Sequence, residues 1–227
     1  MRASKSMRLL AWAILLVTLG FGLRPFNFVS RNDVAYDPVT HGLIFHGKSE
    51  QRFYWQRGIA YTKDPIFFAS HSPFTIATQL SPNRWPLGLG TILELYDDGL
   101  QPPLLLAQWK NDLVVRSRRA EEYQGRPYRE MGVSNVFEDG IPTTLAINYD
   151  GQKARVFVNG QLAETRSYQL IESGSPITAR IVLGNNSTGE SPWSGTLSHF
   201  SLYNRALSPE EIDSASNSPT LDYRFTE

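Results

Sequence analysis

The sequence predicts an all-β protein, an antiparallel two-sheet jelly-roll sandwich with one transmembrane helix at its N-terminus and one short helix near its C-terminus. Three features predict it: short alternating runs separated by Gly, Pro and Asn turns from about residue 32 onward, an uncharged run over residues 9–23, and a helix start at Ser208. With 227 residues the chain can bury one full-sized core. We therefore expect an anchor and junction over residues 1–30 and a single β domain over residues 31–227.

The N-terminal segment has the charge pattern of a membrane anchor. Arg2, Lys5 and Arg8 precede the uncharged run Leu9–Leu23, and Arg24 closes it. As a helix this run spans about 22 Å, shorter than a hydrocarbon core of about 30 Å unless the flanking arginines extend to the interface. The pattern also fits a secretory signal peptide, but we favour an anchor that contacts the lipid bilayer through residues 9–23. Positive charge on its amino side places the N-terminus in the cytoplasm and the β domain across the membrane.

Small residues in this run predict a contact with another membrane protein. Helices associate in membranes through close backbone approach at small residues, because lipid is as apolar as leucine and offers no hydrophobic gain. A passive tether is the alternative. The predicted contact set is Ala13, Gly20, Gly22, Arg24, Phe26 and Phe28.

The β domain is predicted from alternating apolar residues and glycine turns. Thr144–Tyr149, Ala154–Val158 and Gln161–Thr165 are joined by Asp-Gly and Asn-Gly dipeptides, which predicts a three-stranded meander. The other expected strands are 42–46, 74–80, 91–96, 104–108, 113–118, 178–183, 197–203 and 222–225.

One short helix is specified by its N-terminal residues. Ser208 can cap it, Pro209 takes the first helical position, and Glu211 completes a capping box. Leu207 and Ile212 are placed to form a hydrophobic staple across the helix start. The helix is expected to end near residue 215.

The composition excludes several classes of function. Lys plus Arg equals Asp plus Glu at 22 each, so no net field attracts nucleic acid, and we expect no nucleic-acid partner. Arg116, Arg118 and Arg119 are followed by Glu121 and Glu122, which indicates a solvated strand face rather than a basic patch. The absence of cysteine excludes disulfides, thiolate metal sites and cysteine nucleophiles.

Two segments in the second half of the chain resemble a known family. Asn148–Gly160 is similar to the YDG and YVNG hairpin of laminin-G-like, concanavalin A-like jelly rolls. Trp193–Leu197 and Tyr203–Ile212 resemble the closing WxGxI and YNRALSxxEI element of the same domains. The resemblance implies a concanavalin A-like sandwich.

A weaker resemblance concerns the first half. Leu23–Phe28 and Gly42–Phe45 are similar to the junction between a membrane helix and this jelly roll in some VanZ-like bacterial proteins. It implies a single-pass protein of the bacterial inner membrane with a periplasmic domain. The multi-helix VanZ portion is missing, so its function does not carry over.

The same superfamily contains glucan hydrolases, so the catalytic pattern has to be tested. A retaining glycosidase on this fold typically carries E-x-D-x-E along one strand, where a spacing of two keeps the carboxylates on one face. The nearest stretch is Glu94-Leu95-Tyr96-Asp97-Asp98, in which Tyr96 replaces the middle carboxylate. We therefore expect that the protein is not an enzyme.

Candidate ligand residues are few. Exposed aromatic rings could stack on sugars, and the ligand-binding candidates are Trp85, Trp109 and Asn185. The four histidines show no metal-ligand spacing. The resemblance implies that a calcium ion can sit at a loop rim, with Asp97, Asp98 and Asp139 as candidate ligands, although no cofactor is the favoured expectation.

Three hypotheses about function follow, because a fold alone does not specify function. We favour a non-catalytic accessory or structural subunit whose helix packs in the membrane while the sandwich braces a larger complex, with respiratory or photosynthetic complexes as candidate hosts. A carbohydrate-binding, lectin-like module is the alternative, with a glycan as partner. A glycoside hydrolase is the remote alternative.

Overall fold

The structure is a computed structural model that describes residues 5–23, 32–47, 58–69, 71–83, 86–171, 176–214 and 221–223. The chain divides into two units, Met1–Arg31 and Asn32–Glu227.

The first unit contains helix α1, Lys5–Leu23. Over residues 9–18 its apolar side chains are exposed, with Leu9, Trp12 and Leu16 each more than 60% accessible. No helix in the described residues is long and apolar enough to cross a membrane, so the transmembrane helix predicted from the sequence is not found. The physical reason is that the uncharged run covers about 22 Å of helix.

The predicted contact set falls only partly within this helix. Ala13 is exposed on α1, and Gly20 and Gly22 belong to its last turns. Arg24, Phe26 and Phe28 lie outside the described residues.

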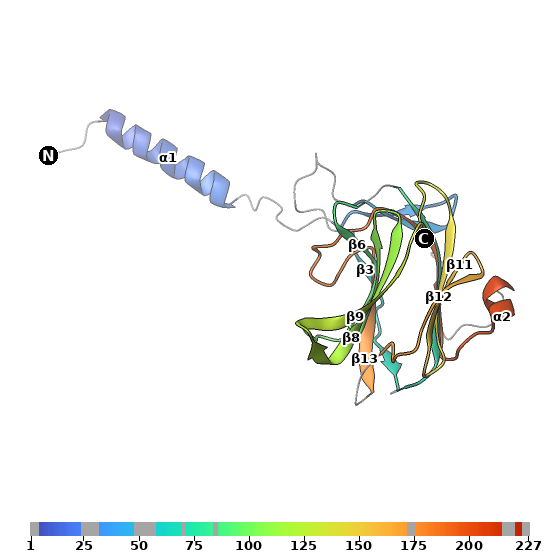
Figure 1. Cartoon of the computed structure of the whole chain (residues 1–227). Coiled ribbons are helices and arrows are strands. Elements are labelled where there is room, and N and C mark those ends of the chain that lie inside the picture. The colour runs from blue at the N-terminus through green and yellow to red at the C-terminus, as the bar shows by residue number, and fades with distance from the viewer. Residues whose placement is uncertain are drawn as a thin grey trace. The chain divides into compact units, whose positions relative to one another are not determined.

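The second unit is a sandwich of two antiparallel sheets that face each other (Figure 1). The eight-stranded sheet has the order β1-β2-β14-β5-β10-β11-β12, with β15 also paired to β14. Its strands are β1 (Val34–Asp37), β2 (Gly42–Phe45), β5 (Phe74–Pro82), β10 (Thr143–Tyr149), β11 (Ala154–Val158), β12 (Gln161–Arg166), β14 (Gly195–Tyr203) and β15 (Leu221–Tyr223). This confirms the all-β, two-sheet prediction.

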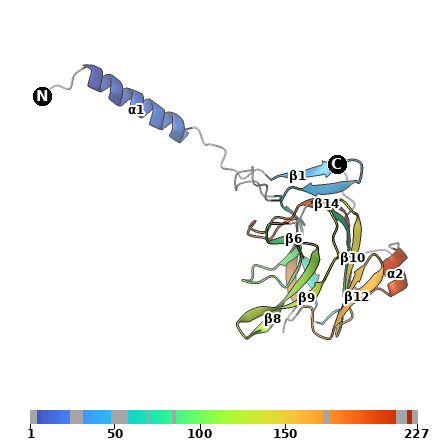
Figure 2. The same ribbon diagram turned by 45° about the horizontal axis from the view of Figure 1, so that its top comes forward.

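The seven-stranded sheet has the order β3-β13-β6-β7-β8-β9, with β4 paired to β13. Figure 2 shows β6, β8 and β9 on the side opposite β10 and β12. Its strands are β3 (Ala60–Tyr61), β4 (Ile66–Phe68), β6 (Leu89–Tyr96), β7 (Leu104–Trp109), β8 (Asp112–Tyr123), β9 (Arg126–Val133) and β13 (Ile177–Leu183).

The predicted meander is present as β10, β11 and β12, with Leu145 opposite Val158 and Val158 opposite Gln161. Four strands were not predicted: β1, β3, β4 and β9. β3 and β4 are two and three residues long, too short for a periodicity to appear. In β9 the charged residues Arg126, Arg129 and Glu130 interrupt the apolar pattern.

The strands near the two ends of the β domain share one neighbour. Strand β2 pairs with residues 195–197 of β14, and β15 pairs with residues 200–202 of the same strand. The full length of β14 pairs with β5 on its other side. The early and late strands therefore follow one another along one edge of β14.

The core lies between the sheets and comes largely from alternate residues of the central strands. In β6, for example, Leu93 and Leu95 are 1% and 0% exposed and belong to the core, so Glu94 between them faces outward. On the eight-stranded sheet a second apolar cluster covers the outer face, where Ala146 and Phe157 meet Leu207 and Ile212 beside helix α2.

Helix α2, Pro209–Ser214, begins as predicted. The Ser208 Oγ accepts a hydrogen bond from the Glu211 backbone N–H at 3.3 Å, and the Glu211 carboxylate accepts one from the Ser208 N–H at 2.9 Å. The two contacts form the capping box. Leu207 and Ile212 are both buried in the cluster beneath the helix, as the staple requires.

Replacing Ser208 with Ala is expected to lower the free energy of unfolding by about 1 kcal/mol, because one N–H of the first turn loses its acceptor. Urea unfolding followed by circular dichroism measures the change. Ser208→Asp, which keeps an acceptor, should retain most of the stability. Equal losses in both variants would contradict the cap.

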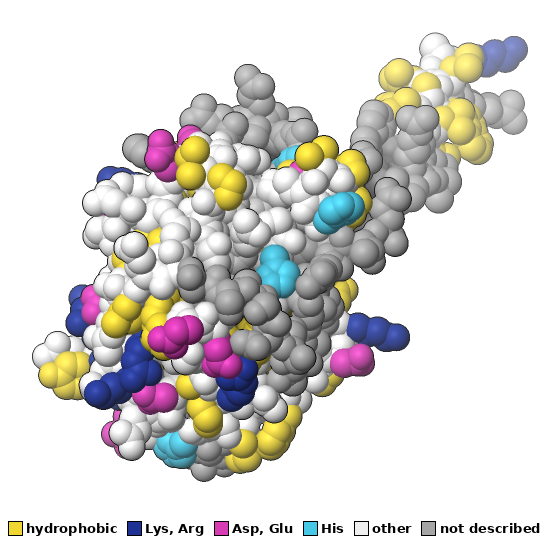
Figure 3. Space-filling model, turned by 90° about the vertical axis from the view of Figure 1, so that its right-hand side faces the viewer, with side chains coloured by type: hydrophobic (Ala, Val, Ile, Leu, Met, Phe, Trp, Pro, Cys, Tyr) yellow, Lys and Arg dark blue, Asp and Glu magenta, His cyan; other side chains and the backbone are white. Residues whose placement is uncertain are grey.

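Charges on the surface are mixed. On the face shown in Figure 3, basic and acidic side chains are interspersed. Ion pairs of the eight-stranded sheet and α2 contribute to this mixture: Arg155–Asp150 at 2.7 Å, Arg166–Glu164 at 3.3 Å and Arg205–Glu211 at 2.8 Å.

Candidate functional site

A row of three side chains crosses the outer face of the seven-stranded sheet. Glu94 on β6 lies opposite Leu105 on β7, and Leu105 lies opposite Arg116 on β8. Neighbouring strands are about 4.8 Å apart, so a carboxyl and a guanidinium flank one leucine over about 10 Å. We call these three residues the floor row.

The floor row is the base of a hollow of about 510 Å³. One wall is the β6–β7 loop at residues 99–102, and the opposite wall is the β13–β14 loop at residues 186–191. Tyr96 and Tyr128 line it next to the floor row. The hollow combines apolar surface with a few fixed polar groups, as ligand sites usually do.

Glu94 is the most buried charged group of the hollow, with an exposed fraction of 3%. Its Oε1 accepts a hydrogen bond from the backbone N–H of Ser187 at 3.1 Å. Burial raises the pKa of the Glu94 carboxyl above its ordinary value, and the contacts with Ser187 offset part of this rise. The carboxyl therefore keeps its proton to a higher pH than an exposed glutamate does.

Arg116 is held in place by two contacts. Its Nε donates a hydrogen bond to the Glu130 carboxylate at 2.7 Å, and its Cζ lies 4.6 Å from the centre of the Tyr128 ring. A guanidinium that is paired and stacked loses little further freedom when it binds a ligand.

The β6–β7 wall is fixed by an ion pair beneath it. Arg118 donates two hydrogen bonds to the Asp97 carboxylate, at 2.6 and 3.0 Å, and a third to the Gln101 carbonyl oxygen at 3.0 Å. Gly99 passes over this pair so closely that an added Cβ would lie 2.5 Å from the Arg118 Nη1. The predicted calcium ligand Asp97 is thus already occupied by an arginine.

The β13–β14 wall is organised by two asparagines. Asn185 is fully buried, and its Oδ1 accepts hydrogen bonds from the N–H groups of Asn186 and Ser191. The Asn186 Oδ1 accepts from the N–H of Glu190 at 2.7 Å. Asn185, predicted as a ligand residue, therefore shapes the loop from behind, while Asn186 lines the hollow.

The other predicted site residues lie elsewhere. Trp109 is 46% exposed at the end of β7 and is not among the residues that line the hollow. Trp85 lies outside the described residues. Asp98 has a left-handed backbone (φ 62°) and hydrogen-bonds to Tyr96, which raises the pKa of the Tyr96 hydroxyl.

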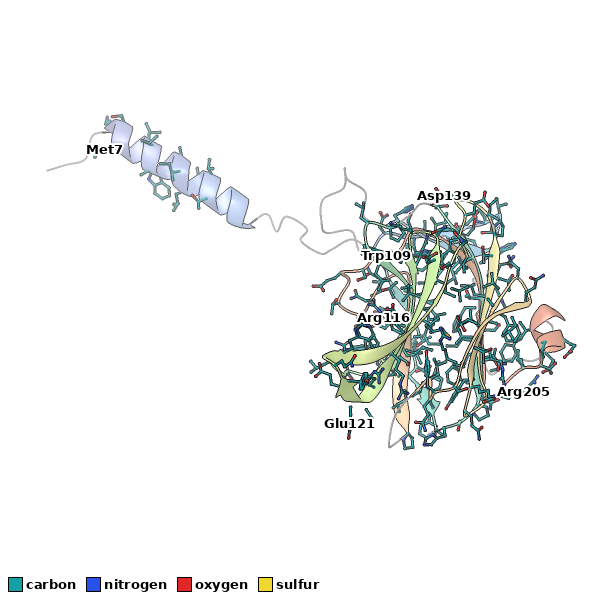
Figure 4. All side chains as sticks on the ribbon, viewed as in Figure 1. Met7, Trp109, Arg116, Glu121, Asp139 and Arg205 are labelled. Atoms are coloured by element: carbon teal, nitrogen blue, oxygen red, sulfur yellow. The ribbon has the colours of Figure 1, made fainter. Side chains whose placement is uncertain are left out.

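The three predicted calcium ligands are not brought together. Asp139 lines a separate hollow of about 570 Å³ with Asn111, Asn135 and Asn159. Figure 4 shows Asp139 toward one end of the sandwich, away from Arg116 of the floor row, and neither Asp97 nor Asp98 lines the hollow of Asp139. In the described part of the chain no three His, Cys, Asp or Glu side chains are grouped so that they could hold a metal ion.

Comparison with known proteins identifies the family. Residues 60–213 match the model of a laminin G-type family described as the concanavalin A-like lectin/glucanases superfamily. This match covers more than half of the chain, and the chain belongs to this superfamily. No curated protein sequence matches the chain significantly.

Several solved structures share the fold at low sequence identity. A SAP-like pentraxin from Limulus polyphemus has a TM-score of 0.51 and 13% identity, with 77% of this chain and 80% of the pentraxin covered. The Ruminococcus gnavus IT-sialidase CBM40 bound to α2,3-sialyllactose has a TM-score of 0.51 and 12% identity, with coverages of 70% and 96%. The binding domain of botulinum neurotoxin DC in complex with rat synaptotagmin II has a TM-score of 0.61 and 14% identity. The alignment covers 82% of this chain but only 45% of that domain.

Proposed function

We propose that the protein is a lectin-like module that binds a glycan in the hollow above the floor row. The observation that carries the proposal is the floor row itself, an apolar residue between a carboxyl and a guanidinium, with Tyr96 and Tyr128 beside it. A sugar ring offers the complementary surface, because its C–H groups can pack on Leu105 and the tyrosines while its hydroxyls bond to Glu94 and Arg116. Superfamily membership and a structural neighbour that binds sialyllactose support the proposal.

We propose further that the sandwich works without catalysis and without a bound metal, and that helix α1 attaches it to a membrane on the exported side. The helix exposes apolar side chains over residues 9–18, and burying that surface in lipid or against a membrane protein is favourable. As a second role, α1 would let the protein brace a larger membrane complex. The proposed location is the bacterial inner membrane, with the β domain in the periplasm.

The first test is a panel of immobilised neutral, acidic and amino-sugar oligosaccharides probed with the full chain in detergent. Replacing Arg116 with Ala is expected to weaken the best interaction by about tenfold or more, since hydrogen bonds to a charged group contribute about 1.5–3 kcal/mol. Arg155→Ala is the matched control, because Arg155 is also half-buried and pairs with a carboxylate at 2.7 Å, but on the other sheet.

Two results would contradict glycan binding in the hollow. One is that no oligosaccharide binds above background. The other is that Arg116→Ala and Arg155→Ala weaken binding equally, which would place the ligand elsewhere. Incubation of the best ligand with the protein, followed by chromatography, tests the hydrolase alternative. We expect the ligand to remain intact with and without added EDTA. Cleavage by the native protein that disappears in Glu94→Gln would overturn the non-catalytic proposal.

A further inference from the structure

The charged side chains that line the hollow differ in whether they have a partner of opposite charge. Its lining contains three charged side chains, Glu94, Arg116 and Glu190. The positive charge of Arg116 is already paired with Glu130, which lies outside the lining. Among the ion pairs of the described residues none includes Glu94 or Glu190. The hollow therefore presents two unmatched carboxylates and a neutralised arginine.

Glu94 is the stronger of the two because of its burial. It is 3% exposed, lies on the floor, and is hydrogen-bonded by Ser187, whereas Glu190 is exposed on the rim loop. A carboxylate can accept about four hydrogen bonds, so Glu94 has lone pairs left for a ligand. A buried carboxylate without a cation is costly, and a ligand that brings a positive charge would offset that cost.

Two further arginines near the hollow do not change this balance. Arg118 is engaged by the Asp97 carboxylate beneath the β6–β7 wall. Arg180 on β13 lies opposite Tyr96 on β6, but its side chain is exposed and is not part of the lining. Neither of these two arginines forms an ion pair with Glu94, and Arg116, across Leu105 from Glu94, is paired with Glu130.

We propose that the ligand of the hollow is an amino sugar that carries a free ammonium group, bound with the ammonium at Glu94 and its ring over Leu105. This inference rests on the proposed glycan binding and specifies its chemical class. An ammonium has three N–H donors and no acceptor, which matches a carboxylate that lacks a cation. The remaining hydroxyls of the ring then face Arg116 and the hydroxyl and amide groups of the β13–β14 wall. An acidic sugar at the same position would place a second negative charge against Glu94.

The test compares three oligosaccharides of equal length by titration calorimetry with the full chain in detergent: a β-1,4 glucosamine trimer, its N-acetylated form and cellotriose. We expect the free amine to bind about tenfold more tightly or better than the other two, because an ion pair replaces a neutral contact. Glu94→Gln should reduce this preference to about twofold or less. The glutamine can still accept the hydrogen bond from Ser187. Glu164→Gln, on the other sheet, is the control and should leave the preference unchanged.

The pH dependence of the unmodified protein gives a second measurement that does not depend on a variant. The carboxylate must be ionised to pair with an ammonium, so the preference for the free amine should fall as the pH is lowered and Glu94 takes up a proton. The groups around Glu94 are Arg116, Glu190 and Tyr96 in the hollow, with Glu130, Asp98, Arg180 and the Asp97–Arg118 pair at its margins. Glu190→Gln separates the rim carboxylate, and it should reduce the preference less than Glu94→Gln does.

The outcomes distinguish this inference from glycan binding as such. Equal affinity for the free and N-acetylated trimers, with Arg116→Ala weakening both, would overturn the amino-sugar assignment and leave the proposed function in place. Binding of none of the three trimers would overturn the amino-sugar assignment, and the proposed function would be overturned if no oligosaccharide of the immobilised panel bound either. A trilysine peptide that binds as well as the glucosamine trimer would also overturn the assignment, since charge alone would then be sufficient.

Discussion

Replacing Trp193 with alanine is expected to lower the free energy of unfolding by about 3–5 kcal/mol. The side chain is fully buried, and its ring centre lies 6.1 Å from that of Phe45 in the core between the sheets. The alanine variant removes the whole indole from the core and leaves a cavity there. Urea unfolding followed by far-UV circular dichroism measures the loss.

Trp193→Phe is the matched control for this experiment, since it keeps an aromatic ring but loses the indole N–H. That N–H donates to the Oε1 of Gln108 at 2.7 Å, and Gln108 is itself fully buried. Leaving this acceptor without a donor costs about 1–3 kcal/mol, so the phenylalanine variant should lie between the native protein and the alanine variant. A loss below 1 kcal/mol for Trp193→Ala would contradict the structural role.

The Trp193 motif is a feature that could be predicted from the sequence, because its contacts are local. The Trp-Ser-Gly stretch could be recognised because Trp193 and Gly195 pack against each other within three residues of sequence. A Cβ added to Gly195 would lie 2.4 Å from the Trp193 ring and 2.6 Å from the Ser81 carbonyl oxygen. The tryptophan therefore requires the glycine two residues later. The same holds for the capping box at Ser208 and Glu211, whose partners are three residues apart.

The floor row could not be predicted for the opposite reason. Glu94 and Arg116 are far apart in sequence, and only the pairing registers of β6, β7 and β8 bring them into one row. In the sequence Glu94 looked like one residue of a broken catalytic motif, and Arg116 like part of a solvated strand face. Strand β9, which supplies Tyr128 and Glu130, was not expected because its charges mask its alternation.

The candidate ligand residues Trp109 and Asn185 lie outside the lining of the hollow for a related reason. Trp109 and Asn185 were chosen for side-chain type, but a binding role depends on the direction in which a side chain points. Asn185 directs its oxygen at the backbone of its own loop. The sequence signal for the hollow is a glutamate between two leucines of a predicted strand, Leu93-Glu94-Leu95. The structure shows that this glutamate is buried without a cation, and charged residues are rarely so buried unless they are paired.

The second large effect is expected at Gly184, where the β13–β14 wall begins. Its φ is +76°, and a Cβ there would lie 1.9 Å from the Cδ1 of Phe45. The Gly184 N–H donates to the Ile92 carbonyl, and the Gly184 carbonyl accepts from the Trp193 N–H, both at 2.9 Å. In Gly184→Ala the left-handed backbone of an alanine costs about 1–2 kcal/mol of stability. Overpacking of the added methyl group against Phe45 costs about 1–3 kcal/mol more. We expect a total loss of about 2–5 kcal/mol in the free energy of unfolding, together with weaker ligand binding because the wall shifts.

Gly125→Ala separates the two contributions. Gly125 has nearly the same φ of +74° in the β8–β9 turn, but nothing lies within 4 Å of its added Cβ. It should therefore lose only the backbone contribution of about 1–2 kcal/mol and bind ligand as the native protein does. If the two variants lose equal stability, Phe45 accommodates the methyl group and the close packing at Gly184 is not what fixes the wall. If Gly184→Ala loses more stability yet binds ligand unchanged, the β13–β14 loop is set by its asparagine hydrogen bonds alone.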